Sequence, residues 1–207
     1  MKKVLFGIMA LSMAAFAANP GTGDPETASV PVKVMAEIIN APVGLTITDE
    51  AGTVLDELVI DHGRIVKGAA TSDSVAYKLF KVQRFDGTTS ETQPIGAGTL
   101  TVELDEKMAT DKKGKATLAK NGDTNHASKL TSTLALTGGA TQESSTKYVH
   151  NLTGADTEAH VGRVTSTIAK GAATDTEGSL LNSELRPGVH HNSRQNTLTV
   201  VYTPTKP

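Results

Sequence analysis

The stretch "GTLTVEL", residues Gly98 to Leu104, alternates between polar and apolar side chains along most of its length. In an extended chain Leu100, Val102 and Leu104 fall on one side, and the intervening residues, ending with Glu103, fall on the other. This two-residue period is typical of a strand with one buried and one solvated face. We therefore predict a β-strand here, with a layer of apolar side chains beneath it.

Similar short runs recur along the chain and are separated by Gly, Asp, Asn and Ser. The predicted strands are 45–48, 53–60, 75–82, 98–104, 129–137 and 196–203. In the last of these, Leu198, Val200 and Tyr202 share one face. Polar segments at 110–129, 143–147 and 169–179 are predicted to be loops. Because Thr and Val favour strands and Gly interrupts every window long enough for a stable helix, we predict an all-β sandwich.

The first 17 residues have the pattern of a secretory signal peptide. Lys2 and Lys3 precede an apolar run, and Ala15-Phe16-Ala17 has the small-x-small form of a cleavage site. The apolar run is shorter than the roughly 20 residues that a membrane-spanning helix needs. We therefore expect secretion through an inner membrane, with a flexible tether rich in Pro and Gly at residues 18–29.

The composition limits the classes of function. The formal net charge is −2 with both signs intermixed, which argues against a nucleic-acid surface. The chain has no Cys, so its stability must come from burial and backbone pairing without disulfide bonds. Aromatic residues make up only 3% of the chain, which argues against a cleft that stacks sugars or bases.

The candidate chemical motifs are weak. His190 and His191 are adjacent, and neighbouring side chains on a strand point to opposite faces, so they could hardly hold one metal ion together. The segment 121–126, "NGDTNH", lacks the ligand spacing of a calcium-binding loop and is better interpreted as a solvated turn. No G-x-S-x-G nucleophile motif is present. We expect no enzymatic activity, no cofactor and no bound metal.

A second alternating segment follows the tether at residues 30–38, "VPVKVMAEI". One side of it is an apolar row, which we call the N-terminal row: Val30, Val32, Val34, Ala36 and Ile38. Pro31 cannot donate a ladder hydrogen bond, which suits an edge or the end of a strand. The segment is either an ordinary first strand of its own domain or a strand donated to a neighbouring molecule. Composition and periodicity alone leave both interpretations open.

The order of these segments resembles the pilins of chaperone–usher fimbriae, and is closest to the α-fimbrial, colonization-factor type of major subunit. The matching parts are the signal peptide, the segment "VPVKVMAEI", the stretch "NAPVGLTITDEAGTVL" from Asn40, and the closing "LRPGVHHNSRQNTLTVVYTP" from Leu185 to Pro204. The resemblance covers roughly the first and last fifths of the mature chain. It implies an immunoglobulin-like β-sandwich of the incomplete pilin type, which a donated strand completes.

The resemblance also implies an organisation and a set of partners. Residues 1–17 are expected to be the signal peptide, 18–39 the tether and donor strand, and 40–207 the pilin domain. A periplasmic chaperone would first cover the incomplete core, and an outer-membrane usher would then exchange it for the N-terminal row of the next copy. Leu198, Val200 and Tyr202 are expected to flank the receiving groove. The assembled fimbrium would stand on a bacterial surface and support adhesion to a host receptor.

The sequence is also compatible with two other functions. The chain could be a monomeric, secreted or surface-bound β-sandwich that binds a ligand through its loops. A secreted hydrolase ranks last, because no acid–base pair is recognisable in the sequence.

Overall fold

The computed structural model describes residues 43–88, 91–106, 114–122, 127–153, 159–171, 177–192 and 196–205. The chain divides into two units, Met1–Asn40 and Ala41–Pro207, and all of the described residues belong to the second. The predicted donor segment 30–38 lies outside the described residues. Every regular element in the described part of the chain is a β-strand, and no helix there is long and apolar enough to cross a membrane.

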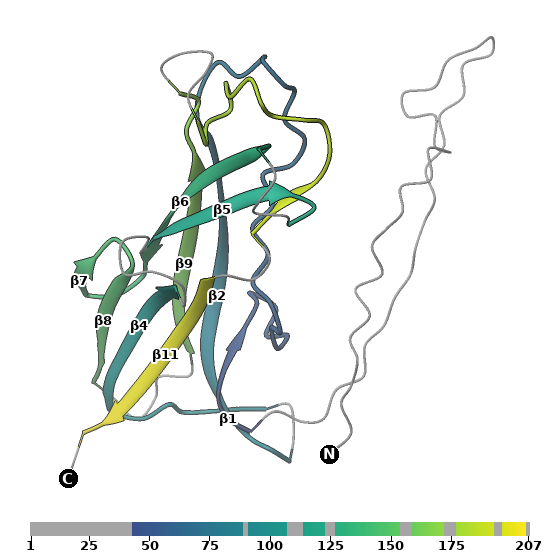
Figure 1. The fold of residues 1–207 in the computed structure, drawn as a ribbon. Helices are drawn as coiled ribbons and strands as arrows, with labels where there is room; N and C mark the ends of the chain where they lie inside the picture. Colours follow the sequence, from purple (N-terminus) through teal and green to yellow (C-terminus); the bar gives the residue numbers. More distant parts are fainter. Residues whose placement is uncertain are drawn as a thin grey trace. The chain divides into compact units, whose positions relative to one another are not determined.

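The strands form two antiparallel sheets (Figure 1). The seven-stranded sheet contains β1 (Val43–Thr48), β2 (Ser74–Asp86), β3 (Thr92–Gln93), β5 (Lys115–Lys120), β6 (Lys129–Thr137), β9 (Ala159–Ile168) and β10 (His190–His191). The four-stranded sheet contains β4 (Gly98–Glu106), β7 (Thr141–Ser144), β8 (Lys147–Leu152) and β11 (Asn196–Pro204). The strand orders are β1-β2-β9-β6-β5-β10, with β3 paired to β2, and β11-β4-β8-β7.

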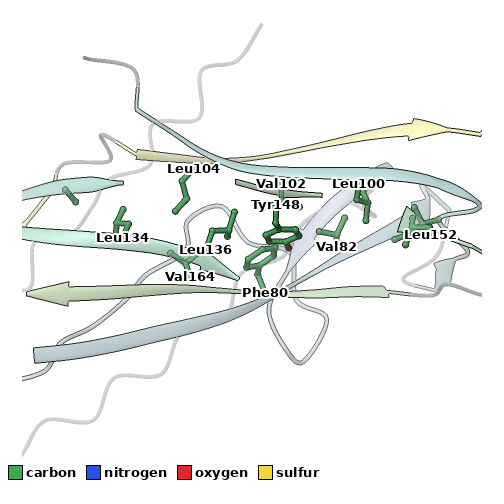
Figure 2. Close-up of a cluster of buried hydrophobic side chains, with 12 residues drawn as sticks. Phe80, Val82, Leu100, Val102, Leu104, Leu134, Leu136, Tyr148, Leu152 and Val164 are labelled. Atoms are coloured by element: carbon green, nitrogen blue, oxygen red, sulfur yellow. The ribbon is translucent and has the colours of Figure 1, made fainter. Parts of the chain in front are cut away.

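One apolar core is shared by the two sheets, which is consistent with a β-sandwich (Figure 2). The seven-stranded sheet contributes Phe80 and Val82 of β2, and the four-stranded sheet contributes Leu100 and Val102 of β4; all four side chains are fully buried. Fully burying one such side chain contributes about 1.5–3 kcal/mol. The all-β prediction is therefore confirmed, together with the inward face predicted for residues 98–104.

A glycine allows the two sheets to approach closely at the centre of this core. Gly162 of β9 lies opposite Phe80 of β2, and a Cβ atom at this position would lie 2.3 Å from Cζ of Phe80 and 2.5 Å from the hydroxyl oxygen of Tyr148. Figure 2 shows the rings of Phe80 and Tyr148 next to one another between the layers. The absent side chain thus leaves room for the two largest fully buried rings.

Several strand predictions are confirmed. Residues 45–48, 75–82, 129–137 and 196–203 lie in β1, β2, β6 and β11, and β6 has the predicted bounds. The prediction for residues 53–60 is wrong, because only Val54 forms an isolated bridge, to Thr48. Leu58 and Ile60 still pack against the core as partly buried side chains without joining a ladder.

Two of the predicted loops contain strands. The polar stretch 110–129 includes β5, and the stretch 143–147 includes the end of β7 and the start of β8. In β5 the inward signal is weak because Ala116, which faces the shared core, is small, while Ala119 is buried on the opposite face. Pairing with β6 makes this segment a strand, and such tertiary context commonly overrides local propensity. In the third predicted loop, 169–179, the described residues 169–171 and 177–179 form no named strand.

Candidate functional site

The edge of the four-stranded sheet at β11 carries the sequence-predicted residues Leu198, Val200 and Tyr202. We call them the β11 inner row. All three pack against the shared core, yet each is only partly buried. Their cross-strand partners on β4, which are Leu104, Val102 and Leu100, are 5%, 0% and 0% exposed.

This difference in burial follows from the position of the strand. β4 lies between β11 and β8, so its inward side chains have neighbours on both sides. β11 is the last strand in its sheet order, so within the described residues it pairs with β4 alone. An unpaired strand edge of this kind presents free N–H and C=O groups as well as apolar surface.

The seven-stranded sheet has a similar edge at β1. Leu45 and Ile47 are partly buried and pack against the same core as the β11 inner row. Their cross-strand partners on β2 are Arg84 and Val82. Each sheet therefore ends in a strand whose inward side chains are incompletely covered.

A contact between Arg84 of β2, the cross-strand partner of Leu45 in β1, and Tyr202 of β11 brings these two ends of the sheets close together. The guanidinium carbon of Arg84 lies 5.3 Å from the centroid of the Tyr202 ring. The Tyr202 hydroxyl donates a hydrogen bond of 2.8 Å to the carbonyl oxygen of Ala97, which holds the ring in place. We refer to the edges of β1 and β11, joined by this contact, as the open edge.

The open edge includes one polar atom without a partner. The Nε atom of Arg84 is buried and has no hydrogen-bond acceptor in the described part of the chain. Buried polar groups in native proteins are nearly always hydrogen-bonded, so an unpaired one calls for an explanation. The sequence contained a signal for this residue, because Arg84 continues the inward alternation of Phe80 and Val82 with a charged side chain.

A cluster of polar side chains lies where the loop before β2 meets the seven-stranded sheet. The Nδ1 and Nε2 atoms of His62 are 2.9 Å and 2.7 Å from the hydroxyl oxygens of Ser74 and Ser166, and Ser166 in turn contacts Ser132. Burial lowers the pKa of His62. Because Ser132 and Ser166 are 1% and 4% exposed, this cluster ties strands together and offers little access to a substrate.

A histidine pair lies between the sheets near the core. The Tyr148 hydroxyl oxygen lies 2.8 Å from Nε2 of His160 in a hydrogen bond, and the ring centroid of His160 is 4.4 Å from that of His150. Burial, followed by the repulsion of His150, lowers the pKa of His160 to about 4. Burial also raises the pKa of Tyr148, so at neutral pH a neutral hydroxyl is paired with a neutral imidazole.

The two weak metal-site motifs of the sequence are the histidine pair of β10 and the segment that begins after β5. His190 accepts or donates through Nε2 at 2.7 Å to the Ser128 hydroxyl, whereas His191 is exposed. Asn121 and Gly122 form a turn after β5, and residues 123–126 lie outside the described part. Among the described residues, no group of three or more His, Asp or Glu side chains could hold a metal ion.

Comparisons with protein-family models and with curated protein sequences found no match to this chain. The fold alone therefore defines the class of this protein. It is an all-β protein whose two antiparallel sheets share an apolar core, with a second, smaller apolar cluster around Leu130, Ile168, Leu180 and Leu185.

Proposed function

We propose that this chain is a structural subunit of a bacterial surface fimbrium that polymerises non-covalently by donor-strand complementation and supports adhesion. In this proposal the second unit is an immunoglobulin-like sandwich of the incomplete pilin type. The N-terminal row of one copy fills the open edge of the next. A periplasmic chaperone and an outer-membrane usher would manage the exchange, as the sequence resemblance implies.

The single observation that carries the proposal is the burial of the β11 inner row. Leu198, Val200 and Tyr202 point toward the core and are only partly covered, whereas their partners on β4 are buried. An added strand beside β11 would complete the cover and pair the free edge at the same time. A complementary apolar row of the right period occurs in the sequence at residues 30–38.

The strand order also supports the proposal. An immunoglobulin constant-type sandwich has strands A, B, E and D in one sheet and C, F and G in the other. The order β1-β2-β9-β6 corresponds to A-B-E-D, and β4 and β11 correspond to C and F. In the described part of the chain, no strand occupies the position of G beside β11. The donated segment would take that position.

The energetics favour a contact between subunits that rarely dissociates. The N-terminal row offers four Val or Ile side chains, and fully burying each contributes about 1.5–3 kcal/mol. The paired backbone adds further stabilisation, while ordering of the tether and loss of free motion oppose it. We expect a non-covalent polymer that survives detergent at room temperature and dissociates on boiling.

The test compares two substitutions in the leading segment. Val34→Asp places a charge in the N-terminal row, whereas Lys33→Asp changes the opposite face of the same strand and serves as the matched control. Surface filaments are isolated and run on a detergent gel with and without boiling. Without boiling, the polymer should give a ladder of oligomer bands that collapses to the monomer on boiling, which we call the boiling-sensitive ladder. We expect Val34→Asp and a deletion of residues 18–39 to abolish this ladder and Lys33→Asp to retain it. A ladder of normal yield from the deletion refutes the proposal.

One observation favours the alternative, a monomeric sandwich that binds a ligand through its loops. A surface pocket of about 390 Å³ is lined by the loop before β2 and by Leu180, and it includes His62, Arg64 and Asp73. Under this alternative the purified mature chain should fold cooperatively as a monomer without a chaperone. Sedimentation velocity on the purified chain distinguishes the two functions, because strand donation predicts oligomers whose formation requires residues 18–39.

A further inference from the structure

Arg84 is a charged residue in a row of apolar side chains. It follows Phe80 and Val82 on the inward face of β2, and its backbone pairs with Leu45 of β1 and Gln93 of β3. Placing a guanidinium among apolar side chains is costly unless its donors are hydrogen-bonded. A leucine at this position would continue the apolar row without the desolvation cost of a guanidinium. The arginine therefore indicates a specific role.

Arg84 is partly buried, and within the described residues its guanidinium has an aromatic neighbour but no carboxylate partner. The guanidinium lies over the Tyr202 ring, which favours a cation but accepts no conventional hydrogen bond. The buried Nε–H group has no acceptor. Arg84 as a whole is only partly buried, so a molecule that fills the open edge meets the part of this side chain that is still exposed.

We propose that Arg84 is the specificity-determining residue of the open edge and that it binds the carboxylate of Glu26 from a second copy of the chain. This inference rests on the proposed function. A carboxylate is the acceptor that suits a guanidinium best, because it takes charge-assisted and bidentate hydrogen bonds. The guanidinium would therefore gain a carboxylate partner only when the edge is filled.

The orientation of the incoming strand points to Glu26. In the position of strand G the donated segment runs antiparallel to β11, so its beginning lies at the Tyr202 end. The inward period of the N-terminal row continues backward through Ala28 to Glu26. With Ala28 opposite Tyr202, Glu26 lies two residues beyond, about 7 Å along the strand, which is comparable to the length of an arginine side chain.

The same register suits the apolar surface along the rest of the edge. Ala28 is small and lies where the Arg84–Tyr202 pair already fills the space, while Val30 and Val32 fall opposite Val200 and Leu198. The later members of the row then extend past Asn196, which donates to the carbonyl oxygen of Lys115 and so lies beside β5. Near that end the partly buried Leu118 of β5 packs against the core.

The pair would select orientation and register as well as affinity. A strand inserted in the reverse direction brings the Ile38–Asn40 end to Arg84, and the inward residue there is the neutral Asn40. Glu37 has the opposite parity and faces away from the core in either direction. Wrong insertions therefore leave the guanidinium unpaired, and an unpaired buried charge discriminates strongly against the wrong partner.

The test is a charge swap in the full chain. We expect Arg84→Glu and Glu26→Lys each to lower the yield of the boiling-sensitive ladder at least about tenfold, and the double variant to restore most of it. Arg163→Glu is the matched control, because Arg163 also lies over a tyrosine, Tyr77, but on the outer face. Single variants with normal ladders, or a double variant no better than the singles, overturn the inference.

A second measurement avoids any effect of Arg84→Glu on folding. Fluorescent synthetic peptides of residues 22–40, with and without Glu26→Lys, are titrated against the wild-type full chain and followed by anisotropy. We expect the substituted peptide to bind at least about tenfold more weakly. Equal binding of both peptides overturns the role of Arg84 and leaves strand donation intact. A wild-type chain that forms no ladder and binds neither peptide overturns the proposed function, and this inference with it.

Discussion

Truncating three valines in turn tests whether the open edge is a vacant part of the core. Val102 of β4 and Val200 of β11 are cross-strand partners on the inner face, and Val201 is the neighbouring outward residue. Val102 is fully buried, Val200 is partly buried, and Val201 is 52% exposed. The three alanine variants remove the same two carbon atoms from three degrees of burial.

The expected losses follow from these burials. Each buried methylene group contributes about 0.8 kcal/mol, and the cavity left behind adds to the loss, so Val102→Ala should cost about 2–3 kcal/mol of unfolding free energy. Val200→Ala should cost about 1 kcal/mol in the unfilled chain, because part of the side chain is already in water. Val201→Ala should stay within about 0.5 kcal/mol of the wild type.

Filling the edge should change only one of these values. When a saturating peptide of residues 22–40 is present, Val200 becomes fully buried, so its truncation should cost about 2–3 kcal/mol, as Val102→Ala does. Urea unfolding curves with and without the peptide measure all three losses. Identical losses for Val200→Ala in both conditions would refute the vacant position. So would a loss equal to that of Val102→Ala before the peptide is added.

Two further predictions concern the core. The pKa of His160 is about 4 in the folded chain and near 6.5 when unfolded, so the stability from burying the neutral ring is complete above pH 6.5 and falls by up to about 3 kcal/mol as the pH drops to 4. Urea unfolding between pH 8 and pH 4 should show this loss in the wild type but not in His160→Gln, and equal slopes would contradict it. Gly162→Ala should destabilise the chain by about 2–3 kcal/mol because its Cβ would overlap the buried rings of Phe80 and Tyr148. A thermal or urea midpoint equal to that of the wild type would contradict this expectation.

Strands with a strict two-residue period were predictable from the sequence. β4, β6 and β11 place Leu or Val at most of their alternate positions. An extended chain puts these residues on one face and the polar residues on the other. β9 was missed although it is the central strand between β2 and β6. Its inward positions include His160, Gly162 and Ser166, which carry little apolar signal. Their burial follows from the large rings and hydroxyl groups that pack on them from other strands.

The candidate site was likewise predictable only in part from the sequence. The alternation of Leu198, Val200 and Tyr202 is local, so the sequence was enough to predict that they share a face. Whether that face is covered depends on which strands lie beside β11, and those neighbours come from distant parts of the chain. The strand order places β11 at an edge and leaves its inner row partly buried, and the packing of the two sheets brings Arg84 of β2 over Tyr202. Side-chain direction follows from the period of one strand, whereas burial and polar pairing are properties of several strands packed together.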